Sequence, residues 1–365
     1  MTTHGGPTKT DPHADDWAIT DEVLRLRAWG TDRMHPLAPA STDERVIGSA
    51  DACWLRLTDA KGRISRAHAA IVERDGRWYV RDLGSKNGTF FDGVRRDEAA
   101  LEPGLEIKIG GTVLVAESAR SAALRGFLGR IIGWKTEQTA AVDLGLRSLR
   151  LWAAHRATLV ICGADDLVMI ARSLHRRALG LDRPFILCDP RRKQSPENVR
   201  NAENYDEGLR ALAPATRGTL CVWAERPPHD FDAVKRALQD PDNRVHLTLC
   251  ARDAAEASAF DSAPITIPIL AQRAAELPRV VEEYADDAVA ELGFTLSLFT
   301  REDRDWVLAN ESASLPEIEK ATARLLAIRH DDGNLNRAAA RLGMARMSLY
   351  KWIGRRKLPI RVVAE

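Results

Sequence analysis

The sequence predicts a multidomain protein with a β-sandwich, an α/β domain built on a parallel sheet, and an all-α domain, in that order. Residues 21–117 contain short apolar stretches separated by Gly and Asp, with no helical period. From about residue 124 to residue 270, short apolar runs alternate with helix-like segments. From about residue 282, apolar residues recur at helical spacing. These three patterns fit three packed architectures in succession.

Composition limits the classes of function. The 365 residues are 45% hydrophobic and 29% charged, with a net charge of +1, so a nucleic-acid site has to be a local basic patch. The five cysteines form no CxxC pair, and four lie in strand-like runs, which predicts buried reduced thiols without a metal or cofactor. Apolar runs are too short to cross a membrane, and we expect a cytoplasmic protein.

The changes in pattern give domain boundaries. The polar beginning of the chain, residues 1–20, reads as a disordered tail. We expect the sandwich at 21–120, a linker at 121–140, the α/β domain at 141–295, a helical connector at 296–314 and the C-terminal helical domain at 315–365.

Two motifs in the sandwich carry binding chemistry. The first is SRAHA at residues 65–69, and the second is DLGSKNGTFFDG at residues 82–93. Ser65 offers a hydroxyl, and Arg66 and Lys86 offer cations for a dianionic phosphate. The amide of Asn87 suits the backbone of a peptide. The motifs resemble those of the forkhead-associated (FHA) domain, which implies a phosphothreonine-containing protein as partner and a scaffold role for His68.

One position departs from the FHA pattern. The family normally has a phosphate-gripping arginine after the pair Ile47–Gly48, whereas this chain has Ser49. Loss of a bidentate arginine costs about 1 kcal/mol or more. Arg45, Arg63 or Lys86 are the candidates to replace it; otherwise the domain binds weakly, or serves only as a docking surface.

The central region resembles, in outline, the AAA+ ATPase domain of sigma-54-dependent activators. Gly163 to Leu167 replaces the Gly-rich loop, with Leu167 where a phosphate-binding lysine stands in the family and two aspartates before it. Trp223–Ala224 replaces the metal-binding acidic pair, and Glu225 comes one residue late. No sigma-contacting loop appears between Cys188 and Gly218. The region therefore predicts a degenerate domain without ATPase activity, acting as a scaffold or joining related enhancer-binding proteins in a mixed ring.

The C-terminal segment GNLNRAAARLGMARMSLYKWIGRR predicts two short helices joined by a turn at Gly343. Leu349 and Trp352 point to the core at i and i+3. The segment resembles the Fis-type helix-turn-helix, which implies double-stranded DNA as partner and a homodimer or higher oligomer paired through residues 317–330. The predicted DNA-binding residues are Arg337, Ala345, Arg346, Met347, Ser348, Tyr350, Lys351, Arg355 and Arg356.

Together these features predict a transcription regulator that couples recognition of a phosphothreonine partner to sequence-specific DNA binding, without being an enzyme. Two alternatives stay open. The first is an active sigma-54-dependent activator, which the damaged ATPase motifs argue against. The second is a scaffold that works through FHA docking alone, which the basic C-terminal segment argues against.

Overall fold

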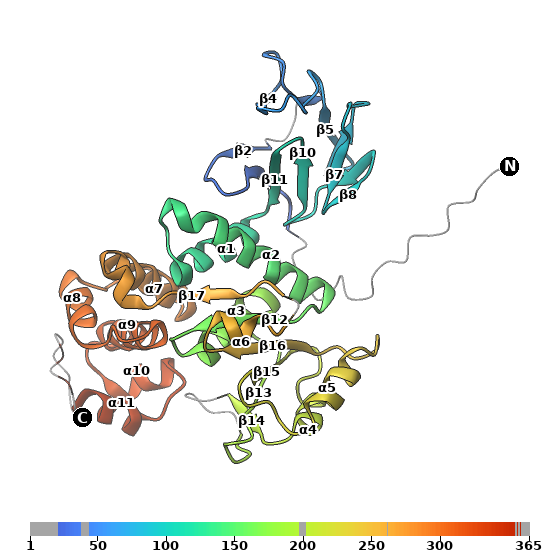
Figure 1. Cartoon of the computed structure of the whole chain (residues 1–365). Helices are drawn as coiled ribbons and strands as arrows, with labels where there is room; N and C mark the ends of the chain where they lie inside the picture. Colours follow the sequence, from blue (N-terminus) through green and yellow to red (C-terminus); the bar gives the residue numbers. More distant parts are fainter. Residues whose placement is uncertain are drawn as a thin grey trace. The chain divides into compact units, whose positions relative to one another are not determined.

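The computed structural model describes residues 21–37, 44–196, 202–260, 262–354, 356 and 358. The expected tail at 1–20 and the predicted DNA-binding residue Arg355 lie outside these residues. The chain divides into two compact units (Figure 1). The first comprises the residues up to 129 together with 135–155, and the second comprises 130–134 together with the residues from 156 on.

The first unit contains the predicted β-sandwich. One sheet has the strand order β2-β1-β11-β10-β7-β8, and the other has the order β4-β3-β5-β6-β9. The first sheet comprises β2 (Met34–Pro36), β1 (Arg25–Ala28), β11 (Thr112–Glu117), β10 (Glu106–Ile109), β7 (Thr89–Phe91) and β8 (Val94–Arg95). The second comprises β4 (Leu55–Arg56), β3 (Arg45–Gly48), β5 (Ala69–Arg74), β6 (Arg77–Asp82) and β9 (Glu98–Ala100).

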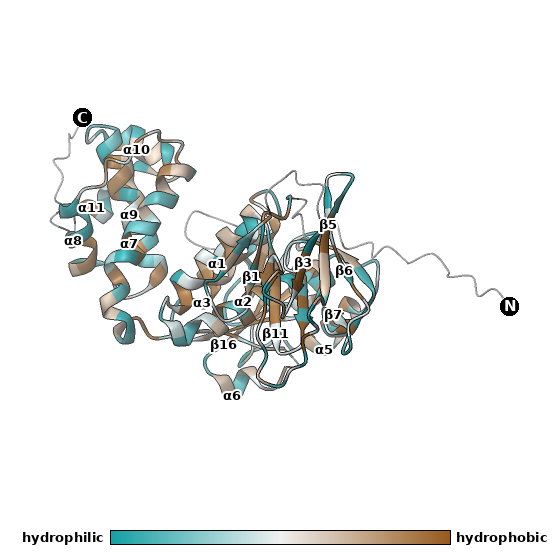
Figure 2. Cartoon of the chain, turned by 90° about the horizontal axis from the view of Figure 1, so that it is seen from above, coloured by the Kyte–Doolittle hydropathy of each residue, from teal (hydrophilic) through white to brown (hydrophobic). Residues whose placement is uncertain are grey.

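Alternation along the strands places the core between the sheets. In β6, Trp78 and Val80 are buried while Tyr79 between them is half-buried. These residues join a cluster that includes Ile47, Phe91 and others from both sheets. Figure 2 shows the hydrophobic stretches in brown on β3, β5 and β11. The sandwich predicted from the strand pattern is therefore present.

The expected linker at 121–140 is instead helical. Helix α1 (Ala119–Ile132), a 3-10 turn η1 (Thr136–Gln138) and helix α2 (Thr139–His155) follow the last sandwich strand directly. All of α2 and most of α1 belong to the first unit, so the α/β domain does not begin at residue 141. Composition failed here because α2 has many buried residues, Leu146, Leu149 and Trp152 among them, as a linker would not.

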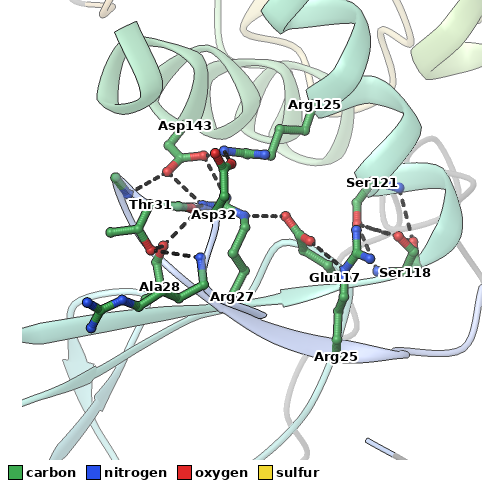
Figure 3. Close-up of polar contacts among 12 residues, drawn as sticks. Arg25, Arg27, Ala28, Thr31, Asp32, Glu117, Ser118, Ser121, Arg125 and Asp143 are labelled. Atoms are coloured by element: carbon green, nitrogen blue, oxygen red, sulfur yellow. Dashed lines mark hydrogen bonds and ion pairs between the residues drawn. The ribbon is translucent and has the colours of Figure 1, made fainter. Parts of the chain in front are cut away.

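A buried ion-pair network attaches these helices to the first sheet (Figure 3). Arg27 on β1 donates two hydrogen bonds to the carboxylate of Asp143 on α2, at 2.9 and 2.6 Å, and a third to Glu117 on β11 at 2.6 Å. Arg125 on α1 donates to the same Asp143 carboxylate at 3.2 Å. The pKa of Arg27 is raised: burial lowers it, but the hydrogen bonds and charges of both carboxylates outweigh that effect.

The second unit contains the predicted parallel sheet, in the order β14-β13-β15-β16-β12-β17. All of its paired strands run parallel. The strands are β12 (Leu159–Gly163), β13 (Phe185–Cys188), β14 (Glu203–Tyr205), β15 (Thr219–Trp223), β16 (His246–Ala251) and β17 (Ile265–Ile267). The intervening helices are α3 (Leu167–Leu179), α4 (Gly208–Leu212), α5 (Phe231–Leu238) and α6 (Ala254–Ala257). The apolar runs predicted each of these strands except β14.

The chain ends in helices, as the periodicity predicted. They are η2 (Leu270–Glu276), α7 (Leu277–Glu291), α8 (Arg301–Asn310), α9 (Leu315–His330), α10 (Leu335–Arg341) and α11 (Arg346–Gly354). Helix α9 begins with Ser314 accepting the N–H of Glu317 at 3.3 Å and ends at His330, shortly before Asp332 and Gly333, both of which have positive φ. Figure 2 shows teal and brown residues mixed along α7 and α9, as amphipathic helices require.

The apolar side chains of α9, the helix expected to pair two chains, are covered within their own chain. Leu315, Ile318, Leu325 and Ile328 are each fully buried. Helices α7, α8 and α10 all pack against α9. Pairing of α9 with a second copy stays a prediction.

The cysteines are free thiols, as predicted, with Cys53 half-buried and the other four buried. Burial raises the pKa of the Cys188 thiol to about 12. Among the described residues no cluster of side chains is suited to hold a metal ion. In the same part of the chain, no helix is both long and apolar enough to span a membrane.

Candidate functional site

Two loops meet at one end of the sandwich and bring together the groups predicted from the N-terminal motifs. The backbone N–H of Lys86, in the β6–β7 loop, donates to the hydroxyl of Ser65, in the β4–β5 loop, at 3.2 Å. The side-chain amide of Asn87 donates to the carbonyl of Arg63 at 2.8 Å. These two bonds fix the loops against each other, so Ser65, Arg66, Lys86 and Asn87 share one surface.

The buried side chain of His68 contacts the backbone of both loops. The Nδ1 atom of His68 accepts the N–H of Ser65 at 3.1 Å, and its Nε2 lies 3.3 Å from the carbonyl of Gly88. Only a ring protonated at Nε2 satisfies both contacts, which makes His68 a neutral scaffold residue. This is the role that the FHA resemblance implied.

The β6–β7 loop is further held by a carboxylate. Asp82 accepts the N–H of Ser85 at 2.7 Å, the hydroxyl of Ser85 at 2.6 Å and the hydroxyl of Thr89 at 2.7 Å. The pKa of Asp82 is lowered: burial raises it, but the hydrogen bonds from Ser85 and Thr89 outweigh this effect. The loop is therefore pre-ordered without any ligand.

The groups at the surface of the loops are available to an anion. Arg66 and Lys86 are exposed, and neither makes an ion pair with an acidic side chain in the described part of the chain. The Ser65 hydroxyl can still donate its proton, since its recorded bond uses the oxygen as acceptor. Asn87 keeps its carbonyl oxygen and one amide hydrogen. Two cations, a hydroxyl and an amide suit a phosphorylated peptide.

Ser49 does not supply the missing cation, and two of its three possible substitutes are occupied. The Ser49 hydroxyl donates to the carbonyl of Ile64 at 3.2 Å. Arg63 makes a two-pronged ion pair with Asp59, at 2.8 and 3.0 Å. Arg45 lies over the rings of two tryptophans, Trp54 at 5.6 Å and Trp78 at 5.0 Å. Of the three predicted substitutes, Lys86 is the one left for a phosphate.

The residues predicted to contact DNA lie on or beside α10 and α11, whose separating turn has Gly343 at φ +62°. Leu349 and Trp352 are buried, as expected. Ser348 and Arg356 are half-buried. The exposed members of the set are Arg337, Ala345, Arg346, Met347, Tyr350 and Lys351.

The basic cluster of this segment is partly neutralised by acids that precede it in the chain. Arg356 makes an ion pair with Glu311, and Arg341 makes one with Asp331 at 3.2 Å. The sequence of the C-terminal segment did not reveal these partners, because both acids lie before it: Glu311 follows α8 and Asp331 follows α9. Arg356 is therefore already paired with a carboxylate of its own chain, and this ion pair competes with contact to a DNA phosphate.

At the edge of the parallel sheet where the ATPase motifs would lie, a cavity of about 230 Å³ is lined by Asp166, Asp189, Trp223 and Arg226, among others. Leu167, in the place of the lysine, is fully buried. Asp165 accepts the N–H of Leu315, the first residue of α9, at 3.1 Å, and burial raises the pKa of Asp165. The Arg226 guanidinium lies 4.7 Å from the ring of Trp223 and pairs with Asp189 at 3.3 Å.

The structure thus defines a class of protein: a β-sandwich that places two exposed cations, a hydroxyl and an amide together on the loops at one end. Residues 45–110 match the family model of the FHA domain. The FHA domain-containing protein FhaB of Mycolicibacterium smegmatis is 43% identical over 70 residues, which is 19% of this chain and 44% of that protein. FhaB of Mycobacterium tuberculosis H37Rv is 41% identical over the same shares. The chain therefore contains an FHA domain, and it spans less than half of the length of these curated relatives.

Solved structures are similar over about a quarter of the chain. EmbR of Mycobacterium tuberculosis, in complex with a low affinity phosphopeptide, is 28% identical over 27% of this chain and 24% of its own, with a TM-score of 0.24. The FHA domain of a hypothetical protein of Arabidopsis thaliana is 25% identical over 27% of this chain and 90% of its own, with a TM-score of 0.24.

Proposed function

We propose that this protein binds a phosphothreonine-containing partner through the loop end of its FHA domain. The observation that carries the proposal is the shared surface of Ser65, Arg66, Lys86 and Asn87, fixed by the Ser65–Lys86 and Asn87–Arg63 hydrogen bonds. A dianionic phosphate would meet two exposed cations and a hydroxyl there, and the peptide backbone would meet the Asn87 amide.

The first prediction concerns affinity. Because Ser49 leaves the site without one cation, we expect weak, phosphate-dependent binding that Ser49→Arg strengthens by about tenfold, or about 1.4 kcal/mol. An array of phosphothreonine peptides, probed with the wild type and with Ser49→Arg, measures both. Arg56→Gln, an exposed arginine on β4, is a control expected to change nothing. An array on which neither protein binds would support a docking-only role for this domain.

We further propose that the C-terminal helices bind double-stranded DNA. The specific observation in favour is that α11 keeps its core contacts through Leu349 and Trp352 while Arg346, Met347, Tyr350 and Lys351 are exposed. An amphipathic helix of this kind fits the major groove. The proposal does not depend on a dimer, because the exposed side chains that carry it all belong to one chain.

The second prediction separates base reading from phosphate contact. Arg346→Ala should cost about 1–3 kcal/mol on a selected DNA sequence if it contacts a base edge. Lys351→Ala should weaken binding to all sequences alike and reduce the salt dependence by about one unit of slope. Gel-shift selection from random DNA provides the sequence, and the exposed Arg301→Gln on α8 is the control. Failure to enrich any motif would contradict sequence-specific DNA binding and leave peptide binding by the FHA domain as the proposed function.

The third prediction is that the α/β unit does not hydrolyse ATP. Phosphoryl transfer needs a cation on the phosphates and a free acid on the metal. Leu167 is buried, Asp165 is bonded to α9, and Glu225 is held by Arg252 at 2.7 Å and by Arg226 at 3.2 Å. Purified protein should release phosphate from ATP at the background rate. Turnover that Glu225→Gln abolishes would overturn this prediction.

A further inference from the structure

A row of outward-facing side chains crosses the first sheet next to the FHA loops. Arg95 on β8 is paired with Phe90 on β7, and Phe90 is paired with Lys108 on β10. Phe91, the neighbour of Phe90, is fully buried in the sandwich core. Because successive residues of a strand point to opposite faces, Arg95, Phe90 and Lys108 share the outer face of the sheet. We refer to these three residues as the β7 row.

The β7 row is continuous with the candidate site. The guanidinium carbon of Arg95 lies 2.9 Å from the position that a Cβ on residue 88 would occupy, so its side chain covers Gly88 directly. Gly88 has φ +77°, follows Asn87, and its carbonyl contacts His68. A peptide held by Asn87 therefore passes within reach of the Arg95 guanidinium when it extends toward β7.

The β7 row carries two positive charges at the surface of the sheet. Arg95 and Lys108 are exposed, and within the described ranges neither makes an ion pair with an acidic side chain. The acids at the far end of the same face are already paired with α2: Asp92 with Arg150 at 2.9 Å, and Glu106 with Arg147. The face beside the loops thus presents two cations flanking a half-buried aromatic ring.

We propose that the β7 row reads acidic residues of the partner that flank the phosphothreonine, with Arg95 as the main contact. The inference rests on the proposed function, because it places the flank of the same bound peptide. Charge complementarity and continuity with the loop site favour this ligand. Carboxylates match the charges of Arg95 and Lys108, and Phe90 offers apolar contact to the methylene groups of the partner's acidic side chains. Arg95 would then set specificity, whereas the loops hold the phosphate.

The test uses the full chain and three synthetic phosphothreonine peptides of equal length, with three glutamates before the phosphothreonine, three glutamates after it, or glutamine at all six places. Affinities are measured by calorimetry at low and high salt. We expect one glutamate peptide to bind the wild type about tenfold more tightly than the glutamine peptide, with the preference shrinking at high salt. Arg95→Gln should abolish that preference, and Arg95→Glu should reverse it, each compared as the ratio of the glutamate-peptide to the glutamine-peptide affinity of the same variant.

Arg96→Gln is the matched control. Arg96 is the next residue and is exposed, and the alternation along a strand directs it away from the face that carries the β7 row. It should keep the wild-type preference. Equal binding of all three peptides by the wild type would overturn this inference and leave phosphothreonine recognition intact. A preference that survives in Arg95→Glu would also overturn it. Binding of none of the three would overturn the proposed function, and the inference with it.

Discussion

At the scale of single residues, the buried guanidinium of Arg27 shows how a charge can be a core residue. The Arg27 side chain is 1% exposed, yet it forms ion pairs with two carboxylates, Glu117 and Asp143, which lie more than 85 residues further along the chain. The alternation of apolar and basic residues in 23–29 is typical of a half-buried strand. The burial of Arg27 was not predictable from it, because its partner Asp143 lies on α2, far away in the sequence.

The fourth prediction follows from this network. Arg27→Ala should lower the free energy of unfolding by about 3–5 kcal/mol, because it leaves Asp143 and Glu117 buried beside fewer cations. Urea denaturation of both proteins measures the difference. Arg25→Ala is the control on the same strand: Arg25 also pairs with Glu117 but is 33% exposed, so its loss should cost about 1 kcal/mol or less. Equal losses of unfolding free energy in the two variants would show that burial of the Arg27 ion pairs adds nothing to stability.

At the scale of elements, long periodic segments were predictable and short or covered ones were not. The apolar spacing predicted the C-terminal helices that include α9, since many side chains repeat the signal along a helix of that length. Strand β14 has three residues and no apolar run, so it left no pattern. Helices α1 and α2 were mistaken for a linker and for the first helix of the α/β domain, because amphipathic spacing does not say which partner a helix packs on.

The fifth prediction concerns α3 and its attachment to the sheet. His175 on α3 is buried, with Nδ1 2.7 Å from the hydroxyl of Thr219 on β15 and Nε2 3.0 Å from the carbonyl of Arg183. Burial lowers the pKa of His175 to about 4, from a usual value of 6.5. Between these values the unfolded chain binds a proton that the folded chain does not, so stability should fall as the pH drops from about 6.5 to about 4. The full loss would be about 3 kcal/mol.

Thermal melting at several pH values, with wild type and His175→Gln, tests this prediction. The variant should be less stable at neutral pH and should show a flatter pH dependence between 6.5 and 4. His229→Gln, at an exposed position, should follow the wild-type curve. Parallel curves for the wild type and His175→Gln would mean that other groups cause the acid sensitivity.

At the scale of the whole molecule, the sequence motifs located the candidate site, but not its full extent. Ser65, Arg66, Lys86 and Asn87 belong to contiguous motifs, and their loops do meet in the structure. Arg95 belongs to no motif, and its place over Gly88 depends on the register of β7 and β8. The Asp92–Gly93 turn before it was the one available signal that the chain folds back there.

Binding of a phosphothreonine peptide at the loop end of the FHA domain can be measured by calorimetric titration of the full chain with an array-selected peptide, phosphorylated and unphosphorylated. We predict saturable binding of the phosphorylated form alone, weakened at least tenfold by Arg66→Ala and by Asn87→Ala while the melting temperature stays unchanged. Equal binding of both peptide forms, or wild-type affinity in both variants, would show that these loops do not recognise the phosphate.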